Sequence, residues 1–414
     1  MSISRVTKAI AEIRRDSKFQ CAESVRDVSF DLLVQDTFSR EIQCLAQIAV
    51  ALALRCFKGR IRIHKLNDAP DLNHDFRDSI ESQAKKFGEE HRLDFAPSER
   101  GPWSLALGCT CEGVISVDSS GWTARINGVF RQRLPAAPSA LAFAVACAFA
   151  KLFNQAILGG GKHVLESWDF CLLRFLSGEN PPLGYAENIH IGKVGLLGAG
   201  AIGSSVGYIL ALSQSTGTLN VIDFDYYEEP NLETCLDADR ESVNVPLRKA
   251  SSLVNSFADH SISAIERRCE LKAGDPLLSE EWDAFICAVD NSDTRQLLDN
   301  VNARVLINGG LGSSKEDAGW ILWTRHCKGD RPLSEIYKKP QEGAVDVTVT
   351  IPDEFQDECS RMHYKGVSLS LPFAALATGS LLVASLYQNA TKTLADAAYL
   401  QMDLFAKQQR MTRM

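Results

Sequence analysis

The sequence lacks the features of a secreted, membrane-spanning or nucleic-acid-binding protein. We expect no N-terminal secretory leader. The sequence has no block of Lys and Arg, and its formal net charge is −8 with a pI near 5.6. Its two longest apolar runs, 139–150 and 371–386, are too short or too rich in small residues to span a bilayer. We therefore expect a soluble, cytoplasmic protein whose main partner is neither nucleic acid nor a membrane.

Paired metal-binding cysteines are also missing. The chain has 12 cysteines but no Cys-x-x-Cys pair, which argues against a tetrathiolate zinc site and, without a leader, favours free thiols. Cysteines in apolar surroundings are expected to be buried small side chains; these are Cys44, Cys56, Cys147 and Cys287. The 414 residues are enough for two or three domains.

The most informative stretch is residues 193–225, KVGLLGAGAIGSSVGYILALSQSTGTLNVIDFD. It predicts an apolar strand, a glycine turn, a helix and a second strand that ends at Asp223. Gly198 and Gly200 permit a tight turn close to phosphate oxygens, and Gly203 permits close packing of helix on strand. The helix N-terminus offers free N–H groups to an anion, and Asp223 stands where a carboxylate accepts bonds from ribose hydroxyls. The pattern predicts a nucleotide site without specifying the nucleotide.

The N-terminal half repeats this order of elements. An apolar strand is expected over 30–34, a helix over 40–57 and a strand over 59–63. Later segments correspond in the same order: Trp103–Leu107 to Trp282–Ala288, Gly121-Trp122 to Gly319-Trp320, and the helix ending at Gln155 to the one ending at Gln388. We infer a diverged internal duplication, and therefore an α/β fold of two tandem Rossmann-like repeats.

Only the second repeat carries the glycine turn. In the first repeat, Ser39, Glu41 and Cys44 take the places of the glycines. A carboxylate and a thiol there would crowd and repel phosphates, so the first repeat is expected to be a degenerate copy that does not bind ATP. Its expected task is to pack against the second repeat and to lend a side chain across.

A linker and one long insertion complete the predicted organisation. Turn-forming residues near position 180 separate a degenerate domain over 1–180 from an active domain over 181–414. Between its Gly-Trp strand and its last helix the first repeat uses about eight residues, whereas the second uses the whole of 325–370. Extra residues at a fixed point of a repeated scaffold usually form a functional loop. This loop contains Cys327 and Cys359.

The second repeat supplies further residues that suit a nucleotide site. Asn231 lies in a Glu-Pro-Asn-Leu segment, Arg248-Lys249 opens a helix, and an apolar strand leads into Asp290. A lysine neutralises phosphates, an asparagine orients ATP, and a carboxylate at the C-terminal end of a strand holds Mg²⁺. This set fits adenylation, whereas a dinucleotide site has no use for the lysine or the magnesium carboxylate.

The motifs GAGAIG, VIDFD, EPNL, RKA, AVDNSDTR and INGG resemble the ATP-binding fold of the ThiF/MoeB and ubiquitin-activating enzyme superfamily. The resemblance covers the second half, and the first half is similar to the inactive adenylation repeat of ubiquitin-activating enzymes. It implies adenylation, with Mg-ATP, of the C-terminal glycine carboxylate of a ubiquitin-like protein. It also makes Asp223 the ribose ligand, Asn231 and Lys249 contacts of ATP, and Asp290 the magnesium carboxylate.

Three departures from the family pattern bear on this expectation. Thr234 stands where the family has an arginine, which leaves the triphosphate one cation short. Arg248 is one candidate to replace it; Arg40 is another, because its Phe-Ser-Arg-Glu segment resembles the Tyr-Ser-Arg-Gln segment that supplies a phosphate-contacting arginine in relatives. The zinc-binding cysteine pairs of many members are absent. We expect the chain to end one helix beyond Gln388, without a ubiquitin-fold or rhodanese extension. A downstream partner would then have to bind surfaces other than such an extension.

The resemblance thus predicts a ubiquitin-like-protein activating enzyme that uses ATP and Mg²⁺ and forms a thioester on Cys359. Its partners would be a ubiquitin-like protein ending in glycine and a conjugating-enzyme-like acceptor, and a homodimer is allowed. Cys327 is the rival nucleophile, and His326, Cys327, Cys359 and His363 could instead form a zinc site. Three competing functions stay open: adenylation of a sulfur carrier or peptide without a thioester, a Rossmann NAD-dependent dehydrogenase, and a non-catalytic scaffold.

Overall fold

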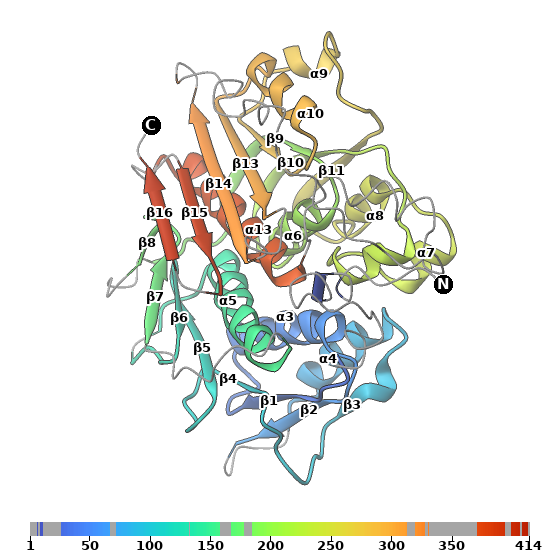
Figure 1. Ribbon diagram of the computed structural model, residues 1–414. Helices are drawn as coiled ribbons and strands as arrows, with labels where there is room; N and C mark the ends of the chain where they lie inside the picture. Colours follow the sequence, from blue (N-terminus) through green and yellow to red (C-terminus); the bar gives the residue numbers. More distant parts are fainter. Residues whose placement is uncertain are drawn as a thin grey trace, which may run out of the picture.

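Two sheets with the same strand order dominate the fold. The computed structural model describes residues 6, 9–10, 26–66, 72–131, 133–157, 167–177, 184–312, 319–327, 330, 371–393, 399–405 and 408–412. Within these ranges the sheets have eight strands each, in the orders β3-β2-β1-β4-β5-β6-β7-β8 and β11-β10-β9-β12-β13-β14-β15-β16 (Figure 1). In both, the first five strands of the order pair in parallel and the last three are joined by antiparallel pairing. The predicted α/β fold of two like repeats is confirmed.

The first repeat comprises β1 to β8 with the helices between them. Its elements are β1 (Phe30–Val34), α3 (Arg40–Cys56), β2 (Ile61–Lys65), α4 (His74–Lys85), η1 (Glu90–Arg92), β3 (Leu93–Asp94), β4 (Ser104–Leu107), β5 (Ile115–Ser120), β6 (Thr123–Ile126), α5 (Pro138–Ala156), β7 (Trp168–Cys171) and β8 (Leu176–Ser177). The strand predicted over 30–34 has those bounds, and the helix predicted over 40–57 is one residue shorter.

The second repeat follows the same plan. Its elements are β9 (His190–Leu197), α6 (Ala201–Ala211), β10 (Thr216–Ile222), η2 (Glu229–Glu233), α7 (Arg240–Asn244), α8 (Lys249–Asn255), β11 (Ile262–Arg267), α9 (Pro276–Ser279), β12 (Ala284–Cys287), α10 (Ser292–Gln296), η3 (Leu297–Asn300), β13 (Val305–Leu311), β14 (Trp320–Cys327), α13 (Pro372–Thr391), β15 (Tyr399–Asp403) and β16 (Gln408–Thr412). The expectation that one helix ends the chain is wrong, because β15 and β16 follow α13 and extend the sheet from β14.

The core lies where the helices of the two repeats meet. α5 and α13 pack against each other between the sheets, and each begins with a proline at its first turn, where the missing N–H costs no hydrogen bond (Figure 1). Phe153 of α5 meets Phe373 of α13 at 5.2 Å between ring centroids, and Phe175 stacks on Trp323 at 4.3 Å. One cluster of buried apolar side chains therefore runs through both repeats.

The apolar character of α5 is explained by this burial. Among the helices described, α5 is the one long and apolar enough to cross a membrane, yet 83% of its most apolar window is buried inside the protein. A helix that is apolar all round is expected at the centre of a fold of this size.

Candidate functional site

The glycine turn lies between two neighbouring strands that end at the same level. In the order β10-β9-β12, Leu197 at the end of β9 pairs with Ile222 on one side and with Cys287 on the other. The turn that follows β9 therefore has Asp223 on one flank and residues 288–290 on the other. This is the point at which the strand order of a parallel sheet reverses, where α/β folds bind ligands in the crevice beyond the strand ends.

Two of the three glycines are required by close contacts. Gly198 has φ +90°, and a Cβ there would lie 2.9 Å from a methyl of Val289. A Cβ on Gly203 would lie 1.9 Å from the carbonyl oxygen of Gly198. Gly200 is different, because a Cβ there would meet no atom within 4 Å, and it caps α6 without any side-chain hydrogen bond. The first turn of α6 therefore presents backbone N–H groups beside open space, as anion binding requires.

Asp223, Asp225 and Lys249 gather on the β10 side of the turn. Asp223 Oδ2 accepts from the N–H of Ala199 at 2.6 Å, and its Oδ1 accepts from the N–H of Asp225 at 2.8 Å. Lys249 Nζ lies 2.9 Å from Asp225 Oδ2. Burial raises the pKa of Asp223 above its usual value, and the two backbone hydrogen bonds and Lys249 oppose that rise. Each Asp223 oxygen keeps a further lone pair for a ribose hydroxyl.

Arg248 and Asn231 are held by the loop that follows β10. Arg248 Nη1 donates to the carbonyl of Phe224 at 3.2 Å, and its guanidinium lies 4.6 Å from the centre of the Tyr226 ring. Asn231 is buried, and its Oδ1 accepts from the N–H of Glu228 at 2.9 Å, which closes a capping box on η2. The geometry thus gives Asn231 a structural task, and its contact with ATP stays a prediction.

The sequence reasoning did not single out Phe224. Its side chain is 50% exposed directly after Asp223, so an aromatic face stands open beside the predicted ribose ligand. The feature that marks Phe224 is the exposure of a large aromatic side chain beside a charged turn. Exposure cannot be read from one sequence, so the sequence alone did not point to this residue.

Asp290 lies on the β12 side of the turn. It is exposed, and its carboxylate makes no hydrogen bond or ion pair to the described residues. Arg295 fixes the backbone around it, donating from Nε to the carbonyl of Val289 at 3.0 Å and from Nη2 to that of Gly309 at 3.2 Å. No group of three or more His, Cys, Asp or Glu in the described ranges could hold a metal. A single free carboxylate still fits Mg²⁺, which usually takes one or two carboxylates together with phosphates and water.

Thr234, the residue at the position of the family arginine, does not face the glycine turn's open space. Its side chain is fully buried, with Oγ1 3.9 Å from the Sγ of Cys235. Thr234, where the family resemblance implies the loss of a phosphate-contacting arginine, is therefore enclosed by protein.

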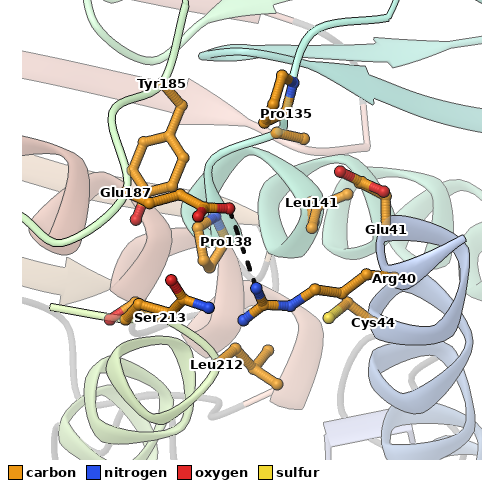
Figure 2. Close-up of a pocket in the computed structure, with 12 residues that line it drawn as sticks. Arg40, Glu41, Cys44, Pro135, Pro138, Leu141, Tyr185, Glu187, Leu212 and Ser213 are labelled. Atoms are coloured by element: carbon orange, nitrogen blue, oxygen red, sulfur yellow. Dashed lines mark ion pairs between the residues drawn. The ribbon is translucent and has the colours of Figure 1, made fainter. Parts of the chain in front are cut away.

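Arg40 is not brought to the glycine turn. It begins α3 and lies beside the last turn of α6, in a cavity lined by Glu41, Cys44, Pro135, Ala136, Pro138, Leu141, Tyr185, Glu187, Leu212, Ser213 and Gln214 (Figure 2). Its Nη1 is 3.9 Å from Glu187 Oε1, and the Gln214 amide bridges the pair, with 2.8 Å between its oxygen and Arg40 Nη1. Gly200 precedes the opposite end of α6, roughly 16 Å away for an 11-residue helix. The expected reach of Arg40 to phosphate within one chain is wrong for this reason.

Helix caps correct the alignment of the two repeats by two residues. α3 follows its N-cap Ser39, whereas α6 follows its N-cap Gly200. The first-repeat residues at the three glycine positions are therefore Thr37, Ser39 and Ile42. Glu41 and Cys44 fall inside the helix instead. Because the equivalent of Ile42 in the second repeat has no room for even a Cβ, the first repeat cannot reproduce the same close turn.

The predicted nucleophiles are only partly within the described ranges. Cys359 and His363 lie outside them, as do most residues of the 325–370 loop. Cys327 ends β14, and burial raises its pKa, which lowers the thiolate fraction near neutral pH. Cys56, Cys147 and Cys287 are buried as expected, and Cys44 is half-buried with its pKa raised by burial to about 11.

Comparison with known proteins adds one family match and several distant structures. Residues 192–393, just under half of the chain, match the family model described as the BilD C-terminal domain. No curated protein matches the chain. Among solved structures, E. coli MccB with ATP is 13% identical with a TM-score of 0.41, over 72% of this chain and 94% of that one. E. coli MccB with SeMet MccA is 15% identical with a TM-score of 0.40, over 54% and 63%. SeMet PaaA is 16% identical with a TM-score of 0.36, over 54% and 64%. This chain thus spans less than two thirds of the length of that MccB chain with MccA.

Proposed function

We propose that the second repeat binds Mg-ATP and adenylates the C-terminal carboxylate of a small protein or peptide. The observation that carries this is the arrangement at one sheet edge of the glycine turn, Asp223 with Lys249 on one flank, and the exposed carboxylate of Asp290 on the other. The glycine turn would bind the phosphates. Asp223 would bind the ribose and Lys249 would offset the phosphate charge, while Asp290 would bind a cation that is held by the phosphates.

The chemistry asks little covalent work of the protein. A carboxylate oxygen of the substrate attacks the α-phosphorus of ATP, the bond from that phosphorus to the oxygen bridging the β-phosphate breaks, and pyrophosphate leaves with the electron pair. The residues at the glycine turn hold the phosphates in line, and Lys249 offsets their negative charge. When bound at Asp290, Mg²⁺ would neutralise part of the charge that develops on the leaving group.

The finer proposal concerns the substrate and a second step. We propose a ubiquitin-like protein ending in glycine as the acyl donor, and Cys359 as the thiol that attacks the acyl carbon of the adenylate. That attack would form a thioester and release AMP. The support is the sequence resemblance and the length of the 325–370 insertion, which an enzyme that only adenylates would not need. Transfer to a conjugating-enzyme-like acceptor would follow.

ATP–pyrophosphate exchange by the full chain tests the adenylation step. We expect exchange with Mg-ATP that depends on a synthetic peptide or small protein ending in Gly-Gly, and none when the terminal carboxylate is replaced by a carboxamide. Calorimetric titration with Mg-ATP and with NAD separates the enzyme classes. Tight binding of NAD without binding of ATP would favour the dehydrogenase, and binding of neither would favour a scaffold.

The thioester step has its own test. Cys359→Ala is expected to retain exchange but to lose a covalent adduct that a thiol reductant releases, and Cys327→Ala is the matched control. An adduct that survives Cys359→Ala but not Cys327→Ala would move the nucleophile. Exchange without any adduct in the unmodified chain would leave adenylation alone, as for a sulfur carrier or a peptide substrate.

A further inference from the structure

Arg55, in the last turn of α3, holds the segment of the second repeat that contains Thr234. Its Nη2 donates to the carbonyl of Cys235 at 2.8 Å, and its Nη1 donates to the carbonyl of Ala51 in its own helix, also at 2.8 Å. The side chain is 1% exposed, and its guanidinium lies 4.2 Å from the centre of the Phe87 ring. The two hydrogen bonds and the contact with the Phe87 ring fix the orientation of the planar guanidinium, and therefore the direction in which it donates.

Arg26 fixes the other side of the same segment. Its Nη1 lies 2.8 Å from Glu233 Oε1, and its Nε donates to the carbonyl of Cys56 at 3.2 Å. It also donates to the carbonyl of Arg55, so that it satisfies carbonyl groups at the C-terminal end of α3 that have no partner within the helix. Two buried arginines of the first repeat thus bind residues 233 and 235, on either side of the buried Thr234.

The held segment rests on the first turn of α6. The N–H of Leu236 donates to Ser204 Oγ at 3.1 Å, and the N–H of Ser204 donates to the carbonyl of Gly200 at 2.8 Å. A continuous series of hydrogen bonds therefore leads from Arg55 through residues 235–236 to the glycine that caps α6. Displacement of the segment would move the N–H groups that face the open space at Gly200.

We infer that Arg55 and Arg26 are positioning residues, through which the first repeat sets the shape of the nucleotide site in the second. The inference rests on the proposed ATP site. It gives the first repeat a task that does not require any of its side chains to touch the nucleotide, unlike the reach expected of Arg40. Two charge-assisted donors aimed at one short segment would be an unusual use of buried arginine if packing alone were needed, since the apolar core already joins the repeats.

Arg55→Lys is the variant that tests this, because it keeps the charge and most of the side-chain stem but loses the planar pair of donors. We expect the Kd for Mg-ATP to rise about tenfold, as loss of one charge-assisted hydrogen bond at the segment implies. We also expect faster hydrogen–deuterium exchange in peptides that cover 199–205 and 229–236. Arg26→Lys is expected to act in the same direction.

Arg92→Lys is the matched control. Arg92 is also buried, at 7% exposed, and donates to the carbonyls of Gly59 and Phe57 at 3.0 and 2.7 Å, both within the first repeat. Arg92→Lys should lower thermal stability by about as much as Arg55→Lys does. It should leave ATP affinity and hydrogen–deuterium exchange at 199–205 unchanged. Unchanged exchange at 199–205 in Arg55→Lys, or changed exchange with wild-type ATP affinity, would overturn the inference. If the wild-type chain itself fails to bind Mg-ATP, the proposed function fails first and the inference with it.

Discussion

Asp237 is a buried carboxylate at the junction of the repeats, and its replacement by asparagine tests the electrostatics of that junction. Neither oxygen is solvent-exposed. Burial raises the pKa of Asp237 from 3.8 to about 6, which the Tyr227 hydroxyl and the Arg55 guanidinium only partly oppose. A shift of this size corresponds to a cost of about 3 kcal/mol for keeping the group charged in the folded protein.

The sign of the pH dependence follows from the raised pKa. Between about pH 4 and pH 6 the folded chain binds more protons than the unfolded chain, because Asp237 is protonated only in the former. The contribution of this group to stability is therefore fully present below pH 4 and is lost as the pH rises through 6. Asp237→Asn removes the charge, so its free energy of unfolding should exceed that of wild type by about 2–3 kcal/mol at pH 7.5, with little difference at pH 4.

Urea denaturation at the two pH values measures this effect, and the exposed Asp259→Asn is the control for loss of one carboxylate. The control should shift stability by less than about 0.5 kcal/mol at both pH values. A gain for Asp237→Asn that is the same at pH 4 and pH 7.5 would refute the reasoning, since it would not arise from ionisation. So would a loss at pH 7.5, which would mean that the charged carboxylate is stabilised where it lies.

Further predictions concern the site itself. Gly203→Ala should lower the free energy of unfolding by about 1–3 kcal/mol, because its Cβ would fall 1.9 Å from a carbonyl oxygen, whereas Gly200→Ala should fold as wild type; equal melting temperatures for both would contradict this. Asp290→Ala should slow pyrophosphate exchange about 10²-fold, and the exposed Asp299→Asn should not; a near-normal rate in Asp290→Ala would move the metal site elsewhere. Arg40→Ala should leave the Kd for Mg-ATP unchanged, and a rise of tenfold or more would show that Arg40 reaches a nucleotide in some assembly not described by one chain.

Apolar runs and glycine spacing in the sequence predicted those strands and turns whose formation depends on neighbouring residues. The apolar run at 30–34 became β1 with the same ends, and the glycine spacing located the turn before α6. The alignment of the glycines with the first repeat was two residues off, because the N-cap that starts each helix cannot be counted from apolar spacing alone. The short strands β15 and β16 were missed, since β15 is set by antiparallel pairing with β14, far away in the sequence, and β16 in turn pairs with β15.

The site residues divide in the same way. Asp223 and Asp290 follow strands that the sequence reveals, so their places at one sheet edge were predictable. The hydrogen bond from Arg55 to the carbonyl of residue 235 joins positions 180 residues apart, and it depends on how the two repeats pack. No spacing or motif in either segment indicates such a contact. Arg40 shows the opposite error, since a local likeness suggested a reach that the direction of α3 and α6 does not permit.

The shared core between α5 and α13 has a consequence for how the molecule responds to dilution. Two halves of like topology that meet in this way have the layout of a two-fold dimer joined into one chain. In a dimer of separate chains the contact would be lost below its dissociation constant, and both halves would share one sequence. Here each half is tethered to the other at a fixed local concentration, so one can keep a glycine where the other has Ile42. Nucleotide binding should accordingly be independent of protein concentration down to the nanomolar range, with one nucleotide for each chain.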